Sequence, residues 1–387
     1  MSRRPGLVGG RRALLAALLL LGPATARAGP IASRPLGLST GGAFGSLFLE
    51  PTGSDARGLP GAELEISWSL ANDWGAPVPL RAGARRIWIQ TDVQTDSLAV
   101  RLRLPWAQLL GQPPGSPWDR LSTAVEARLV QHWGGWTDRP IETWHGWVGS
   151  TNFGRASFER DRVRVLALDL ETGRGLRLED PRLSPGDLVL RTQLLLAQGG
   201  RSPLGADLAR WGLSARLDAK VPIGRPSTLG GSGGWDAGAA LLTTAELLPG
   251  LTLHALAGAT LISPLPASLP LPVQPLRLFG ELSLAMQLGP WALLLEGRVS
   301  GPIARDLSPL PEVSPFQVEA SAYYGLALAA SRVGFGLRRG AVTFWLSEDW
   351  SLGAAPRATG ASNWFYNSNA PDLALGLQWT VPLGAGR

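Results

Sequence analysis

The chain contains no cysteine among its 387 residues. That absence excludes disulfide bridges, thiolate catalysis and metal sites with cysteine ligands. Charged residues make up only 17% of the chain, well below the usual quarter. After the first few dozen residues, no apolar run approaches the roughly 20 residues of a membrane-spanning helix. Stability must therefore come from an apolar core or from the closure of a hydrogen-bonded sheet.

The N-terminus has the features of a secretory signal peptide. Four arginines lie within the first twelve residues, residues 13–21 are uniformly apolar, and Ala26-Arg27-Ala28 fits a small-x-small cleavage site. The apolar run is about half the length that a spanning helix needs. We therefore expect residues 1–28 to be removed and residues 29–387 to form one exported domain. The arginine pairs leave a twin-arginine export route open.

The rest of the chain repeats segments in which apolar and polar residues alternate. Such a period of two predicts strands with one apolar face and one polar face. The segments are about 8 to 12 residues long, which is typical of tilted membrane strands. The pattern occurs in residues 62–70, 98–104, 213–221, 251–261, 278–287, 291–300, 317–328 and 373–380.

The connections between these segments are alternately short and long. Turn signals at residues 248–250, 288–290 and 339–340 predict hairpins, whereas residues 263–275 and 301–315 are rich in proline and predict loops. This alternation is typical of outer-membrane barrels. We therefore predict an all-β fold, an antiparallel transmembrane β-barrel of roughly 12 strands. An exported soluble β-sandwich remains the alternative, because its strands alternate too.

The alternation weakens around residues 105–155, where we expect a partly helical excursion. Residues 121–133 fit a strand or a helix, and residues 140–147 have apolar residues at helical spacing. The excursion is interpreted as a plug, a loop over the barrel mouth or an interfacial helix. Its candidate site, or alternatively a structural polar cluster, consists of Glu142, Trp144, His145 and Arg155.

If the apolar faces meet lipid, the polar faces line the lumen. Buried charges must be paired or hydrated, so the lumen is either closed by its charges or filled with water around a passage. The basic candidates come mainly from the first half of the chain and the acidic ones from the second, which suggests a transverse field. The candidates are Arg101, Arg103, Arg128, Arg162, Arg164, Arg191, Arg216, Asp218, Lys220, His254, Glu281, Glu296 and Glu319.

Other kinds of chemistry have weak support. The three histidines lack zinc-site spacing, and we expect neither a metal nor another cofactor. Residues 230–234 match the Gly-x-Ser-x-Gly elbow, but they lie in a glycine-rich turn between predicted strands, without the strand–turn–helix context that the motif needs. The formal charge of +6 is spread along the chain without a basic block, so we expect no nucleic-acid partner.

Short motifs resemble those of a known family. They are Ile-Glu-Thr-Trp-His at 141–145, Asn-Phe-Gly-Arg at 152–155, Asp-Ala-Lys-Val-Pro-Ile-Gly at 218–224, Gly-Ser-Gly-Gly-Trp-Asp at 231–236, Ser-Glu-Asp at 347–349 and Ala-Pro-Asp at 370–372. Their order resembles the Gram-negative family called domain of unknown function 3187, which implies an outer-membrane barrel and supplies no activity. The motifs at residues 218–224 and 231–236 also resemble those of barrels linked to uptake of aromatic compounds. Ile223 replaces the usual threonine, and the last residue is Arg387 instead of an aromatic.

These observations predict a monomeric outer-membrane barrel in contact with lipid. Its expected role is a passage or binding vessel for a small polar or aromatic solute, without enzymatic activity. Two alternatives stay open. One is a membrane-embedded enzyme that modifies lipids, with His254 or His145 as its base. The other is a structural barrel with a plugged lumen.

Overall fold

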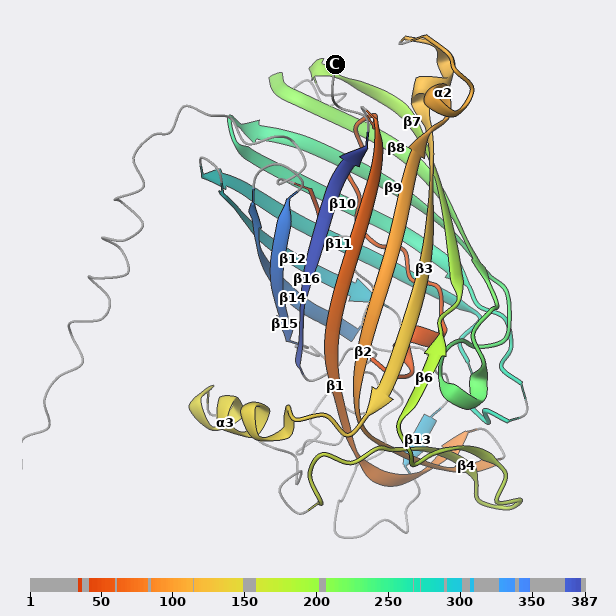
Figure 1. The fold of residues 1–387 in the computed structure, drawn as a ribbon. Helices are drawn as coiled ribbons and strands as arrows, with labels where there is room; N and C mark the ends of the chain where they lie inside the picture. The colour runs from red at the N-terminus through yellow and green to blue at the C-terminus, as the bar shows by residue number, and fades with distance from the viewer. Residues whose placement is uncertain are drawn as a thin grey trace, which may run out of the picture.

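The computed structural model describes residues 34–36, 42–59, 61–82, 85–113, 115–148, 158–201, 207–266, 268–271, 273–288, 291–300, 307–309, 327–337, 341–348 and 373–383. Within these residues, twelve antiparallel strands form the wall of a barrel (Figure 1). They are β1 (Ala62–Ala82), β2 (Arg85–Pro105), β3 (Leu121–Trp133), β7 (Leu188–Arg201), β8 (Asp207–Val221), β9 (Asp236–Leu248), β10 (Leu251–Leu261), β11 (Leu276–Leu288), β12 (Trp291–Ser300), β14 (Ala327–Leu337), β15 (Val342–Glu348) and β16 (Leu373–Leu383).

The wall closes through β1, which pairs with both β2 and β16. Ile66, for example, lies opposite Val100 on one side and Trp379 on the other. From β2 to β16, each wall strand pairs with the wall strands directly before and after it in the chain. A closed ring leaves no strand edge unpaired. The predicted fold class and the strand number of roughly 12 are therefore confirmed.

The wall has the opposite arrangement of side chains to that of a soluble protein, with apolar side chains exposed and charged side chains buried. Leu217 on β8 is 68% exposed, whereas its neighbours Arg216 and Asp218 are buried. On β12, Leu295 is exposed and Glu296 is fully buried. Alternation thus directs apolar side chains outwards and charged side chains into the lumen. A soluble sandwich would do the reverse, so that alternative does not describe this fold.

The two ends of the barrel differ in their connections. Two residues separate β9 from β10 and β11 from β12, and four separate β14 from β15; the strand ends at these connections and the last residues of β16 lie at the upper end in Figure 1. We call this the short-connection end. The opposite, long-connection end carries the loop between β10 and β11 and the small strands β4 (Arg164–Asp169), β5 (Gly175–Leu178) and β6 (Arg182–Pro185).

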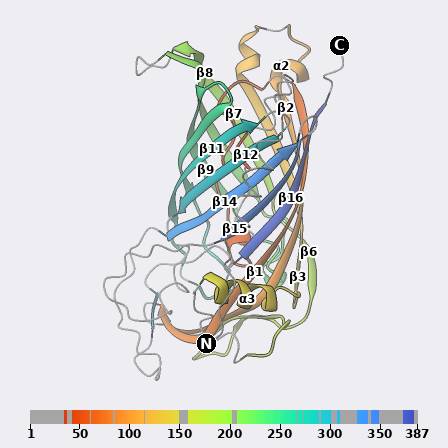
Figure 2. The same ribbon diagram turned by 90° about the vertical axis from the view of Figure 1, so that its left-hand side faces the viewer.

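The region expected to form an excursion is divided by a wall strand. Residues 121–133 form β3, which pairs with β2 and β7. The helical segments lie on either side of it: α2 (Trp106–Leu109) and the 3-10 turn η3 (Pro117–Arg120) at the short-connection end, and α3 (Asp138–Val148) at the other (Figure 2). The predicted helical content is confirmed, but none of these helices enters the lumen.

The lumen is occupied instead by residues 34–36 and 42–58, which we call the plug (Figure 1). Leu36 packs inside the barrel against Leu294 and Trp345. Residues 42–48, which include η2 (Gly45–Leu47), reach the long-connection end and pack against the loops there. The chain then returns through the lumen and enters β1 at the short-connection end. Of the three interpretations of residues 105–155, the plug therefore does not apply to the part of that region that the structure describes, and the plug comes from the N-terminal side of β1 instead.

Candidate functional site

The wall binds the backbone of the plug through long polar side chains. Lys220 Nζ donates to Leu47 O at 2.6 Å, and Arg298 Nη2 donates to Pro51 O at 2.7 Å. Thr52 O accepts from a further wall arginine at 2.6 Å. The plug forms no strand, so its buried carbonyl groups need such partners. Charged side chains therefore take the place of a sheet neighbour.

Acidic and hydroxyl groups of the wall accept hydrogen bonds from the plug in the same way. Leu49 N donates to Asp236 at 2.9 Å, Gly53 N to Glu281 at 3.1 Å, and Leu36 N to Glu296 at 3.1 Å. Two of these acceptors, Glu281 and Glu296, were predicted to line the lumen. The structure places both carboxylates inside the barrel, where each accepts a hydrogen bond from the plug.

Glu50 of the plug lies between two buried arginines. Its carboxylate is 3.7 Å from Arg277 Nη2 and 3.3 Å from Arg298 Nη1, and all three side chains are almost completely buried. Both guanidinium groups also lie over the ring of Phe279. The sequence analysis missed Glu50 and Arg277. Arg277 precedes Glu281 on β11 by an even number of residues, so both side chains lie on the same face of the strand. This spacing could have identified Arg277 from the sequence.

Lys220 is the centre of a second cluster, at the long-connection end. Its Nζ lies 3.1 Å from Asp187, 3.0 Å from Asp236 and 2.5 Å from Ser232 Oγ. Asp187 also accepts hydrogen bonds from the backbone of Ile223 and Gly224. This explains the Lys-x-Pro-x-Gly and Gly-Ser-Gly motifs as a polar turn that fixes two loops, and Ser232 has a structural role in it.

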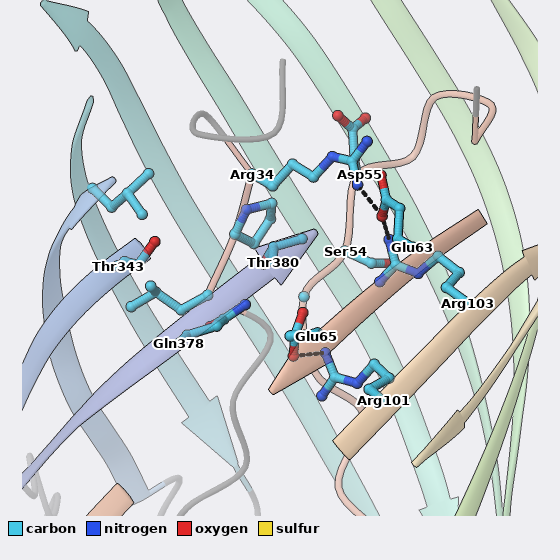
Figure 3. Close-up of a pocket in the computed structure, with 14 residues that line it drawn as sticks. Arg34, Ser54, Asp55, Glu63, Glu65, Arg101, Arg103, Thr343, Gln378 and Thr380 are labelled. Atoms are coloured by element: carbon cyan, nitrogen blue, oxygen red, sulfur yellow. Dashed lines mark hydrogen bonds and ion pairs between the residues drawn. The ribbon is translucent and has the colours of Figure 1, made fainter. Parts of the chain in front are cut away.

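A third cluster joins four neighbouring strands around Glu126 on β3. This carboxylate contacts Arg101 at 2.6 Å, Arg128 at 2.5 Å and Arg191 at 2.8 Å. Arg101 reaches a second carboxylate, Glu65, at 2.9 Å (Figure 3). The structure places all three arginines on the inner face of the wall, and Glu126 is the group that brings them together.

Ion pairs also organise the ends of the plug. Arg34 pairs with Glu63 of β1, which lies 3.8 Å from Arg103 (Figure 3). Asp55 and Arg57 pair with each other at 2.6 Å. Burial favours a higher pKa for Asp55, but its hydrogen bonds to Arg57 and the charge of that group lower the pKa to about 2. Asp55 is therefore ionised at any physiological pH.

His254 on β10 was a candidate base, and the structure places it in the lumen, fully buried. Its Nδ1 lies 2.9 Å from Thr244 Oγ1, which accepts a hydrogen bond from the plug at Ala56 N. The threonine hydroxyl is thus free to donate to His254. This chain of contacts supports the plug and gives the hydroxyl no exposed position from which to attack a substrate.

Several other candidates lie outside the lumen. Arg162 pairs with Glu159 on the surface, and Arg164 begins β4, where it is half-exposed beside Glu179. Their predicted lumen positions are wrong, because the alternation there belongs to a small sheet beyond the wall. Glu319 lies outside the described residues.

Of the predicted cluster of Glu142, Trp144, His145 and Arg155, the structure describes the first three residues, all on α3. Glu142 pairs with Arg160 at 2.6 Å, a partner that the sequence analysis did not identify. His145 is buried on α3, and Trp144 is exposed. Arg155 is outside the part of the chain that the structure describes. The residues present form a surface ion pair beside a buried histidine.

The predicted separation of charge between the two halves of the chain is not seen. Carboxylates of Glu65 and Glu126 lie among the first-half arginines, and Arg277 and Arg298 lie among the second-half acids. Charges alternate between neighbouring strands, so most are paired locally. The lumen therefore consists of separate ionic clusters held together by the plug.

Two cavities lined by described residues border plug residues 53–54 in the lumen. The larger has about 460 Å³ of unfilled space, part of it open to solvent, and reaches from the plug to β15 and β16 (Figure 3). The smaller, of about 290 Å³ measured in the same way, lies between the plug and β2, β3, β7 and β8. Arg101 and Arg103 border both cavities.

In the described ranges, no group of three or more histidine or acidic residues is placed to hold a metal ion. Nor does any helix there have the length and apolar character to cross a membrane.

No family model and no curated protein matches this chain. Among solved structures, it is similar to the COG4313 outer membrane channel from Pseudomonas putida F1, with a TM-score of 0.48 and 12% identity over 86% of this chain and 99% of that one. It is also similar to the CymD monoaromatic hydrocarbon channel (TM-score 0.33, 10% identity, 84% and 90% covered). A Pseudomonas aeruginosa FadL homologue gives a TM-score of 0.33 and 9% identity, with 83% and 90% covered.

Proposed function

We propose that this chain is an outer-membrane β-barrel that admits a small solute through a polar lumen controlled by its plug. The observation that carries the proposal is the closed wall with leucines outside and ionic clusters inside. Only lipid makes a favourable neighbour for such an outer surface. The proposed location also rests on the expected signal peptide at residues 1–28. Barrels of this class have short periplasmic turns, so the short-connection end would face the periplasm.

A passage is favoured over a sealed structural barrel by the way in which the lumen is filled. Eight strands enclose a space that side chains alone can fill, and twelve enclose more. Here the additional space holds a segment attached through hydrogen bonds and ion pairs, with two cavities beside it. Polar contacts of this kind can be exchanged for water. The solute that we propose is small and polar or aromatic, and the protein acts as a monomer of the domain of unknown function 3187 family.

The proposal is tested on the purified, refolded or membrane-extracted protein. We expect a shift in gel mobility between unboiled and boiled samples, because a closed barrel resists detergent until heated. In planar bilayers we expect small, discrete conductance steps, and in liposomes slow swelling with small solutes. A barrel that shows the mobility shift but neither conductance nor swelling would support the sealed structural alternative instead.

The enzymatic alternative makes its own prediction. We expect His254→Ala and His145→Ala to leave the lipid profile of expressing cells unchanged, because His254 supports the plug and His145 is buried in α3. Lipid mass spectrometry of cells with each variant, compared with cells with the unaltered chain and without it, measures this. A lipid species that depends on the chain and disappears in either variant would establish the enzyme.

A further inference from the structure

The exposed apolar band on the outside of the wall ends beside α3. On β1, Trp68 is 37% exposed, and four residues further on the polar side chain of Asn72 is buried. On β2, Leu98 lies opposite Trp68 and is 43% exposed, whereas Gln94 lies opposite Asn72 and is buried. Alternate residues of a strand share a face, so all four side chains lie on the outer face. This face therefore changes from exposed apolar to buried polar over four residues, or about 13 Å.

The two buried amides hold the beginning of α3. Asn72 Nδ2 donates to Thr137 Oγ1 at 2.8 Å and to Asp138 Oδ1 at 3.2 Å. Gln94 Oε1 accepts hydrogen bonds from Trp136 N at 3.2 Å and from Thr137 Oγ1 at 3.1 Å. α3 is therefore attached to the outer face of the wall where the exposed apolar band of β1 and β2 ends.

The helix runs across the wall and not along it. It lies beside β1 in Figure 1 and in front of β1 in Figure 2, and in both views its axis crosses the long axis of the barrel. Because the two views differ by 90°, this orientation is a property of the molecule. A helix placed in this way is parallel to the plane of any membrane that surrounds the wall.

α3 has a buried face and an exposed apolar face. Ile141 and His145, four residues apart, are buried. Pro140, Trp144 and Trp147 are exposed and repeat at spacings of four and three residues, so they form one stripe along the helix. Trp147 is 79% exposed, the highest fraction of any large apolar side chain that the structure describes. A helix surface that faces water normally carries polar residues at such positions.

The remaining side of the helix is polar. Glu142 pairs with Arg160 at 2.6 Å, and Arg139 and Gly146 are exposed. An exposed aromatic stripe next to a polar side is typical of a helix that lies in a membrane interface. Tryptophan is enriched at that level of the membrane, because its ring is apolar while its N–H can still donate a hydrogen bond.

We propose that α3 is an interfacial helix whose Trp144 and Trp147 insert into the lipid surface at the long-connection end. Lipid is favoured over a protein partner because α3 begins where the apolar band of the wall ends, so the stripe continues a surface that the proposed function already places in lipid. In the proposed orientation this is the outer leaflet. The inference rests on the proposed function, since it needs a membrane around the wall.

The test uses a spin label, because the chain has no cysteine of its own. The full mature chain with Trp147→Cys is labelled with a nitroxide and reconstituted in phosphatidylcholine vesicles. Collisions of the label with oxygen, which concentrates in lipid, are compared with collisions with a water-soluble nickel chelate. We expect the oxygen-to-nickel ratio to approach that at Leu217→Cys, on the outer face of β8, and to exceed that at Glu171→Cys, on the exposed tip of the β4–β5 hairpin.

The matched control is Gly146→Cys, the neighbouring position on α3. A Cβ at this position meets no other atom within 4 Å, so the variant should fold. One residue turns the helix by about 100°, which places this label on the polar side. We expect it to collide more with nickel than the label at Trp147→Cys. Trp136→Cys, at a side chain that is 55% exposed directly before α3, replaces Trp147→Cys if that variant lacks the heat-dependent mobility shift.

The outcomes separate this inference from the proposed function. Equal nickel collisions at Trp147→Cys, Gly146→Cys and Glu171→Cys, with a label at Leu217→Cys in lipid, would refute the interfacial helix and leave the membrane barrel standing. An immobile label at Trp147→Cys that collides with neither reagent would also refute it, because another protein segment would then cover the stripe. Free collision of nickel with the label at Leu217→Cys would refute the membrane location itself, and the interfacial helix with it.

Discussion

Removing plug residues 34–58 is expected to convert small conductance steps into large, permanently open ones, with an increase of about tenfold or more for a twelve-strand wall. The plug fills the lumen between β8, β11 and β12, where Thr52 O, Gly53 N and Pro51 O are bound by wall side chains. None of these contacts forms part of the strand ladder that closes the wall. The barrel should therefore remain closed and resist detergent without the plug.

The measurement is single-channel recording together with the heat-dependent mobility shift. The control is a deletion outside the lumen. We choose residues 170–174, the tip of the β4–β5 hairpin at the long-connection end, because these residues lie away from the lumen. Conductance that stays small in the folded plug deletion would show that another part of the chain limits the pore. A deletion variant that loses the mobility shift would show instead that the plug is needed to close the wall.

How far the sequence predicts this molecule depends on the range of the interactions involved. Strand alternation is local, so β8 and β10, with Arg216 and His254 on their inner faces, could be predicted together with the side that faces the lumen. The motif at residues 218–224 was also visible, although only the structure shows that Asp187 is its partner.

The plug could not be predicted in the same way. Residues 50–58 lack periodicity, and their partners lie up to 248 residues away, as for Glu50 and Arg298. Nothing local distinguishes such a segment from an exposed N-terminal tail. One signal was present: the polar faces of the wall carry more charge than a water-filled pore requires, and buried charges need partners.

The same reasoning explains why residues 121–133 fitted both a strand and a helix, and why Arg162 and Arg164 were expected in the lumen. β3 was ambiguous because Val130 lies on its polar face and Gln131 on its apolar face, which breaks the alternation. Arg162 and Arg164 alternate like wall residues, but Arg164 begins the short strand β4, which pairs with β2 beyond the wall, and Arg162 directly precedes that strand. An alternating pattern of apolar and polar residues predicts a strand with two different faces, but it does not predict which sheet contains that strand.

Glu50→Gln is expected to release the plug without unfolding the wall. The substitution leaves Arg277 and Arg298 buried without the carboxylate that lies between them. Removing one partner of a buried ion pair costs about 3–5 kcal/mol. That cost falls on the docked plug alone, because water can reach both arginines once the plug has left the lumen. The equilibrium between docked and released plug should therefore shift by a factor of about a hundred or more.

Trypsin provides the measurement, because cleavage after Arg57 requires the plug to leave the lumen, where Arg57 is paired with Asp55. We expect rapid cleavage at Arg57 in Glu50→Gln and longer open times in bilayers. The matched control is Glu159→Gln, which removes the same charge from an exposed pair with Arg162 and should leave both measurements unchanged. Adding Arg277→Gln to Glu50→Gln should restore part of the protection, since it removes one of the two cations that lose this carboxylate and leaves the hydrogen bond from Arg298 to Pro51 O in place. Equal cleavage rates in Glu50→Gln and Glu159→Gln would show that the plug is held by its backbone hydrogen bonds and not by this charge.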